Sequence, residues 1–239
     1  MRKSLAALTV ASAALAGCQV RAESGGATVS RNYQVGNFQQ IEVAGPYDVE
    51  VRTGGNPGVS ARGSEKLLEH TIVEVDGDKL VIRPERHDGW FHFGWSSHGN
   101  AHFMVTVPQL SGATIAGSGD IKVDRVAGQK FEGTVAGSGG INVAALDVQS
   151  LKLSIAGSGG VKGAGKAQSA EYDIAGSGDV DAGGIQAQQL KVSIAGSGGV
   201  KAHSSGTADV EIMGSGDVEV SGGAKCSISK QGSGDVRCS

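Results

Sequence analysis

The tripeptide Gly-Ser-Gly recurs seven times in the second half of the chain, and this repeat constrains the fold more than any other feature. The copies follow one another at nearly constant intervals; their first glycines are Gly117, Gly137, Gly157, Gly176, Gly196, Gly214 and Gly232. A unit of about 20 residues that recurs many times is typical of a solenoid, in which each unit packs mainly on its neighbours.

Apolar residues alternate with polar or small residues on both sides of each Gly-Ser-Gly. Counted from the first glycine, position −2 is Ile or Val in six copies and position +4 is Ile or Val in all seven. A period of two indicates strands with one buried face and does not fit a helix. Each unit is therefore predicted to be a strand, a corner, a second strand and a connection of variable length, stacked about 4.8 Å from the next unit.

Stacked strand–corner–strand units predict an all-β fold, a right-handed parallel β-helix over residues 111–239. The right-handed form is favoured because the strict six-residue period of left-handed forms is absent. Residues 28–110 are predicted to be an irregular, β-rich N-terminal part.

The corners contain the residues that most resemble a functional motif. Four of them continue into aspartate and three into glycine, and the turn residues singled out are Gly117, Ser118, Gly119, Asp120, Gly176, Asp179, Gly214 and Asp217. Calcium-binding repeats also combine glycine with aspartate, but they have a shorter, nonapeptide period and supply ligands from adjacent turns. We therefore favour a structural role, in which the Ser and Asp side chains bond exposed backbone at the bend. No metal site and no cofactor are predicted.

Catalytic motifs are not evident in the repeats. The repeats contain seven identical serines but a single histidine, His203, so the serines cannot form seven catalytic triads. The glycine-rich turns lead into strands, whereas a phosphate-binding loop opens a helix and carries a lysine.

The N-terminus predicts export. Residues 1–17 contain Arg2 and Lys3, then a short apolar stretch and small residues, as in a signal peptide. The sequence Leu-Ala-Gly-Cys that ends at Cys18 resembles a bacterial lipobox, which implies lipidation of Cys18; an ordinary signal peptide is the alternative. Gln19 follows, which in such lipoproteins suits the outer membrane, and residues 18–27 are expected to be a flexible tether.

The net charge of the chain limits which partners are expected. Removal of residues 1–17 changes the formal charge from −3 to −5, and no basic run remains, so nucleic acid is not an expected partner.

The remaining cysteines, Cys226 and Cys238, occupy positions −6 and +6 of the last unit. A disulfide that closes this unit and caps its free end is predicted for an oxidising compartment; two buried free thiols are the alternative.

The N-terminal part has its own strand signals. The segment around Gly45 fits the repeat template and is predicted to be a degenerate first coil, while residues 72–82 are predicted to form a hairpin. Residues 64–69 are expected to form one helical turn. Residues 103–107 are expected to form a strand that enters the array.

Residues 85–103 concentrate aromatic and histidine side chains. The candidate binding residues are Trp90, Phe91, Phe93 and Trp95. Aromatic side chains anchor many binding surfaces, but they are also suited to covering an edge of the β-helix. Four histidines share the segment, at spacings that match no common metal motif; they are His87, His92, His98 and His102.

The lipobox, the segment from Phe38 to Val51 and the later Gly-Ser-Gly-Asp-Val repeats together resemble a bacterial family, the "putative auto-transporter adhesin, head GIN domain" proteins. The resemblance covers residues 28–239 and implies a right-handed β-helix in the cell envelope, without an established activity. We therefore expect a non-enzymatic, lipid-anchored binding or scaffold protein of a Gram-negative outer membrane, acting on glycan, cell wall or another envelope protein. The alternatives are a polysaccharide-active β-helix enzyme and a purely structural or envelope-stress protein.

Overall fold

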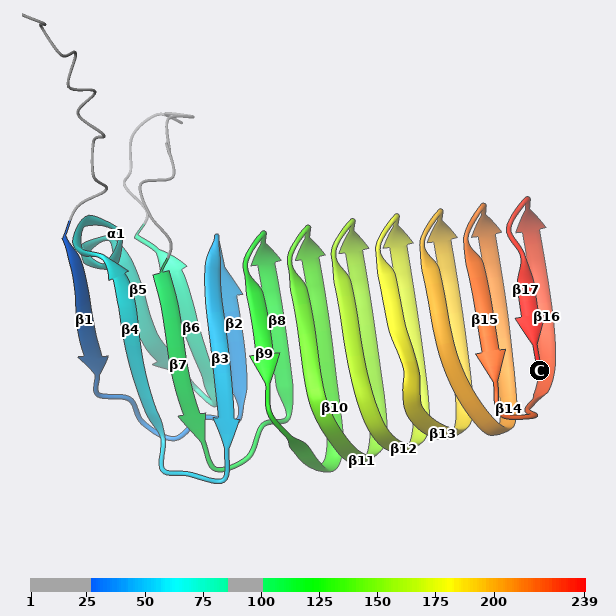
Figure 1. Cartoon of the computed structure of the whole chain (residues 1–239), viewed down its shortest axis with the longest axis horizontal. Coiled ribbons are helices and arrows are strands. Elements are labelled where there is room, and N and C mark those ends of the chain that lie inside the picture. The colour runs from blue at the N-terminus through cyan, green and yellow to red at the C-terminus, as the bar shows by residue number, and fades with distance from the viewer. Residues whose placement is uncertain (1–26, 86–100) are drawn as a thin grey trace, which may run out of the picture.

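The computed structural model describes residues 27–85 and 101–239, which form one rod of stacked coils (Figure 1). The N-terminal part contains β1 (Thr28–Tyr33), β2 (Gln40–Ala44), β3 (Tyr47–Thr53), β4 (Gly58–Ser64), α1 (Glu65–Glu69), β5 (Thr71–Asp76), β6 (Lys79–Pro84) and β7 (Ala101–Val107). The array contains β8 (Gly112–Gly117), β9 (Asp120–Val123), β10 (Val126–Gly137), β11 (Gly140–Gly157), β12 (Gly160–Gly176), β13 (Asp179–Gly196), β14 (Gly199–Gly214), β15 (Asp217–Ser221), β16 (Lys225–Gly232) and β17 (Val236–Cys238).

The array is a right-handed parallel β-helix, as the sequence predicted. Each coil rises to a Gly-Ser-Gly corner and descends after it, and the successive coils follow one another along the rod (Figure 1). We call the segments before the corners the ascending wall and those after them the descending wall. Equivalent residues are stacked in register, for example Val135 on Ile155 and Ile141 on Val161.

The inward residues form continuous apolar ladders. The six Ile and Val side chains at position −2 are at most 2% exposed; they are Ile115, Val135, Ile155, Ile174, Ile194 and Ile212. Full burial of such a side chain contributes about 1.5–3 kcal/mol to folding. The period of two therefore assigned the faces correctly in these coils.

The connections contain more strand than expected. β11, for example, continues through the second bend of its coil, because backbone pairing to the next coil resumes at once, with Leu146 paired to Gly165. The register shifts in this part of the coil, between Val143 and Leu146 and between Lys162 and Ala164. The variation in repeat length is thus absorbed at the second bend, as the spacing indicated.

The N-terminal part continues the solenoid in an order that differs from the chain order. β2 and β3 meet at Gly45 and stack directly on β8 and β9, which confirms the coil predicted there. β6 and β7 stack in parallel on the other side of β2 and β3. The strand expected over residues 103–107 is present as β7 and leads along the chain into β8, but it does not stack on the array: β7 pairs with β3, and the β2–β3 coil lies between β7 and the first array coil.

The far N-terminal end is closed by antiparallel strands and by α1. The predicted hairpin is present as β5 and β6, and β1 and β4 pair antiparallel beside β7. The predicted helical turn, α1, buries Leu67 and Leu68 against this end of the core. None of the helices in the described residues is long and apolar enough to cross a membrane.

Candidate functional site

The Gly-Ser-Gly corners are built for close stacking of backbone. The first glycine adopts a positive φ, for example 132° at Gly157, which side chains with a Cβ rarely adopt. A Cβ on the second glycine, as at Gly159, would collide with the carbonyl oxygen of Gly139 in the preceding coil. The serines between them are exposed at the surface. Both glycines are therefore explained by coil stacking.

Two of the four corner aspartates bond backbone, as predicted for the Asp side chains. The Asp179 carboxylate accepts a hydrogen bond from the Gly199 amide at 2.9 Å, and the Asp217 carboxylate accepts one from the Asp235 amide at 2.9 Å. Each carboxylate thus leans over the equivalent residue of the next coil. Within the described residues, no three His, Cys, Asp or Glu side chains lie close enough together to hold a metal ion.

A shallow groove runs along the descending wall, beside the corners. It consists of two adjoining hollows of about 440 Å³ and 330 Å³, which share Asp179 and Asp181. Glycines at Gly140, Gly160 and Gly199 form part of its lining. Because these residues carry no side chain, the wall is lower there than beside the aspartates. We call this feature the descending-wall groove.

One row of charged side chains in the descending-wall groove alternates in sign from coil to coil, beside a corner row whose charged members are all aspartates. The run is Lys162, Asp181, Lys201, Glu219 and Arg237, each in register with the next. The Lys162 ammonium donates to the Asp181 carboxylate at 2.8 Å, and this hydrogen bond raises the pKa of Lys162 above its ordinary value. The groove therefore presents ammonium, guanidinium and carboxylate groups at a regular spacing of about 4.8 Å.

The ascending wall has a second alternating run, and part of this run lines a hollow of about 350 Å³. Its members are Glu132, Lys152, Glu171, Lys191 and Asp209, again in register. The Lys152 ammonium lies 3.2 Å from the Glu171 carboxylate and 3.0 Å from the Asp173 carboxylate. Hydrogen bonds to Asp173 and Glu171 raise the pKa of Lys152.

The candidate aromatic segment lies outside the described residues. This applies to Trp90, Phe91, Phe93 and Trp95, and also to three of the four histidines, His87, His92 and His98. The chain leaves the described part after Glu85 and returns at Ala101, at the edge of the rod where other coils have their corners. His102 is described: it is exposed on β7, and its Nε2 lies 3.8 Å from a Glu50 carboxylate oxygen.

One serine–histidine contact was not anticipated from the sequence. His203 Nδ1 lies 3.2 Å from the Ser221 hydroxyl oxygen, in consecutive coils of the array. The Ser221 hydroxyl donates to the Ala202 carbonyl at 3.3 Å, so its proton is directed to backbone and not to the imidazole. This contact stabilises the second bend and gives no activated nucleophile.

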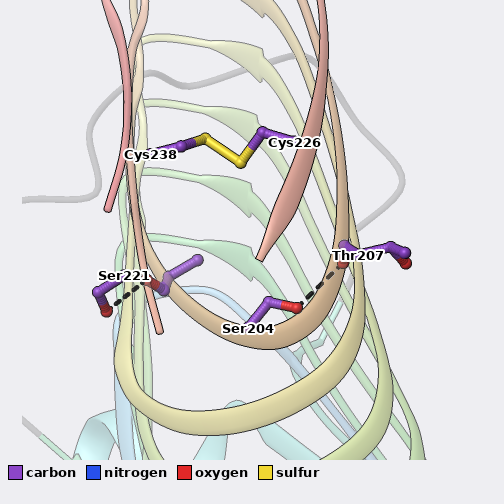
Figure 2. The surroundings of a disulfide bond; sticks show 6 residues. Ser204, Thr207, Ser221, Cys226 and Cys238 are labelled. Atoms are coloured by element: carbon purple, nitrogen blue, oxygen red, sulfur yellow. Dashed lines mark hydrogen bonds between the residues drawn. A yellow bond between two sulfur atoms is a disulfide. The ribbon is translucent and has the colours of Figure 1, made fainter. Parts of the chain in front are cut away.

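The last coil contains the predicted disulfide. Cys226 on β16 and Cys238 on β17 are bonded across the interior of the coil (Figure 2), with their Cα atoms 6.7 Å apart. In the bend of the preceding coil, the buried Ser204 hydroxyl donates to the Thr207 carbonyl at 3.0 Å (Figure 2). The alternative of two free thiols does not hold in this structure.

The fold and the repeats define a parallel β-solenoid whose corners are formed by glycines. The chain belongs to the family described as "Putative auto-transporter adhesin, head GIN domain", whose model matches residues 37–224. Comparison with curated proteins finds no match.

Solved structures share the fold at low sequence identity. A putative adhesin from Bacteroides fragilis NCTC 9343 is similar at 21% identity and a TM-score of 0.78, over 89% of this chain and 97% of that one. A putative lipid binding protein from Parabacteroides distasonis ATCC 8503 is similar at 24% identity and a TM-score of 0.69, over 90% and 98%. A putative adhesin from Parabacteroides merdae ATCC 43184 is similar at 18% identity and a TM-score of 0.65, over 89% and 96%.

Proposed function

We propose that this protein is a non-enzymatic lipoprotein of the bacterial envelope that binds an extended glycan along its descending-wall groove. The observation that carries the proposal is the groove itself: it follows the rod axis and repeats its polar groups once per coil. Such a repeat is suited to a linear polymer, whose own groups recur at regular intervals. Membership of the adhesin-like family supports a binding role.

The chemistry of the groove favours a hydrated, polyhydroxylated ligand over a protein partner. Carboxylate groups accept hydrogen bonds from sugar hydroxyls, and ammonium and guanidinium groups donate to them. Protein interfaces depend on buried aromatic and apolar anchors. The large exposed apolar side chains of the described residues are Met104, Met213 and Ile228, and none of them lines the groove.

The environment of the groove carboxylates supports binding over catalysis. Asp179 and Asp217 are exposed and accept hydrogen bonds from backbone amides, while Asp181 is paired with Lys162. Glycosidases need one protonated and one ionised carboxyl flanking the bond to be cleaved, in contrasting environments. The three aspartates are instead all exposed, and each accepts a hydrogen bond from backbone or lysine.

Lipid on Cys18 would hold the N-terminal end of the rod near the membrane. β1 begins at Thr28, a short distance along the chain from Cys18, and it lies at one end of the rod, whereas β16 and β17 lie at the other (Figure 1). The array would then project from the membrane surface. Labelling with a fatty-acid analogue tests this proposal: the wild-type chain should be labelled and Cys18→Ser should not, and equal labelling of both would contradict it.

Glycan binding is tested on an array of envelope polysaccharides with the full chain carrying Cys18→Ser. Lys201→Ala and Asp181→Asn should each weaken binding at least tenfold, because both side chains line the groove. Lys191→Ala is the matched control, since Lys191 occupies the alternating run on the ascending wall and should leave binding unchanged. Binding that all three variants retain would place the ligand elsewhere. Capture of an envelope protein without glycan binding would overturn the glycan proposal.

A further inference from the structure

The C-terminal end of the rod is a sheet edge on both walls. Within the described residues, β16 pairs with β14 and β17 pairs with β15, and neither strand has a partner on its other side (Figure 1). The backbone groups on that side are a template for a further strand. A second copy of this chain presents matching strands, so uncontrolled end-to-end association is the specific hazard of this edge.

Lys230 interrupts the apolar ladder at this edge. It occupies position −2, which is Ile or Val in the six preceding coils, and it is in register with Ile212. Its coil otherwise retains apolar inward side chains: Ile228 is 50% exposed and Val236 is partly buried. The charge therefore stands at an inward position of the one array coil that is covered on a single side.

The Lys230 ammonium also replaces a hydrogen bond that a further coil would make. Along the array, the carbonyl of the second corner glycine accepts a bond from an amide of the next coil, as Gly159 does from Asp179 at 3.2 Å and Gly198 from Asp217 at 3.2 Å. Gly234 is the equivalent glycine of the last coil. Its carbonyl accepts a bond from Lys230 Nζ at 2.7 Å.

We infer that Lys230 terminates the solenoid: it satisfies the last corner carbonyl and prevents a second copy of the chain from stacking on the C-terminal edge. Stacking would enclose the ammonium between two apolar layers, and an unpaired buried charge is strongly unfavourable. The Cys226–Cys238 disulfide holds the two strands of the coil together across its interior and so keeps Lys230 at the edge. An inward-pointing charge is a known means of blocking edge-to-edge pairing.

The test compares Lys230→Ile with Lys225→Ile in the full chain carrying Cys18→Ser, so that lipid drives no association. Both variants lose one positive charge and gain the same side chain at an exposed position of the same strand, but Lys225 lies at an odd, outward offset, whereas Lys230 lies at an even, inward one. Sedimentation velocity should show monomers for the parent and for Lys225→Ile over a hundredfold range of concentration. Lys230→Ile should form dimers, and small-angle scattering should show a lengthened particle.

Two milder variants keep the inference testable if Lys230→Ile fails to fold by circular dichroism. Lys230→Met removes the charge and keeps the length, so it should associate. Lys230→Gln keeps an amide donor for Gly234 and should stay monomeric. Monomers for both Lys230→Ile and Lys230→Met, or equal association of Lys230→Ile and Lys225→Ile, would overturn the inference.

Discussion

The array and the N-terminal part build the same kind of coil by different paths of the chain. In the array each coil stacks on the next one in sequence, so that Val135 lies on Ile155, its equivalent in the following repeat. In the N-terminal part the coil of β2 and β3 lies between two later segments. Ile41 pairs with Leu80 on one side and with Ala113 on the other, and both partners are distant from it in the sequence.

The two regions are therefore stabilised by contacts of different range along the sequence. A solenoid of consecutive coils is stabilised by nearest-neighbour contacts, so its folding can start in any coil and propagate. The coil of β2 and β3 is complete only after residues up to Val123 have folded, and closing such long loops costs entropy and slows folding. The core also differs, since aromatic side chains such as Tyr47 and Phe103 fill the N-terminal coils where the array uses mainly Ile, Val, Leu and Ala.

The largest effect is expected from a charge in the middle of the array. Val135 is fully buried between Ile115 and Ile155. Val135→Asp places an unpaired carboxylate in this apolar ladder, which costs several kcal/mol and is enough to unfold a domain of ordinary stability. Circular dichroism and urea unfolding should show loss of the folded state or a large decrease in the unfolding midpoint.

Thr134→Asp is the matched control for the buried charge. Thr134 is the preceding residue and faces outward, and its partners in the neighbouring coils, Thr114 and Ser154, are uncharged. The variant should unfold within about 0.5 kcal/mol of the wild type. Comparable destabilisation by both variants would mean that the two faces of the strand are assigned wrongly.

A smaller and more local effect is expected from Tyr47 in the N-terminal part. Tyr47 is fully buried, its ring packs edge-on against Phe103 at 5.5 Å, and its hydroxyl lies 3.1 Å from the Thr71 hydroxyl oxygen. Tyr47→Ala should cost about 3–5 kcal/mol, as removal of a large aromatic core side chain does. Tyr47→Phe, which removes only the hydroxyl, should cost about 1 kcal/mol.

Hydrogen exchange makes the Tyr47 prediction a test of the comparison between the two regions. If the array depends on nearest neighbours, Tyr47→Ala should accelerate exchange in β2 to β7 and leave β12 and β13 protected. Uniform acceleration over the whole chain would show that the two regions unfold as one unit.

The sequence predicted the array well because its pairing partners are consecutive. A residue such as Val161 recurs at the same position in each repeat, so the pattern along the chain is also the pattern in space. The order of the N-terminal coils could not be obtained in this way, since nothing in the local pattern of β7 records that it pairs with β3, much earlier in the chain. The coil at Gly45 was predicted because it retains the template.

The candidate site was less predictable than the fold. The glycines Gly140, Gly160 and Gly199 were interpreted only as corners without a carboxylate, whereas in the structure they help to form a continuous groove. A groove is a property of several coils together and leaves no mark on one repeat. The disulfide was predictable because positions −6 and +6 of one coil face each other.

A smaller loss of stability is expected at the end of the array, when the disulfide is removed. The Cys226–Cys238 bond closes a short loop, with a sequence separation of 12. Replacing both cysteines by serine should reduce the free energy of unfolding by about 2–3 kcal/mol, and calorimetry should show a lower melting temperature. Reductant should shift the wild type and leave the double variant unchanged. Two thiols titrated in the native, unreduced protein would contradict the bond.

The smallest effect is expected on the ascending wall, where Lys152 contacts Glu171 and Asp173. Because these hydrogen bonds raise the pKa of Lys152 in the folded protein, they stabilise the fold fully below the ordinary lysine pKa of about 10.4, and their contribution is lost as the pH rises through the higher folded value. The side chain is 37% exposed, so solvent screening limits the effect to about 0.2–1 kcal/mol. Lys152→Met should therefore be slightly less stable than the wild type near neutral pH, and the difference should disappear once the pH exceeds the raised pKa of the folded protein. A difference that persists in this alkaline range would mean that Lys152 stabilises the wall through its methylene chain and not through its charge.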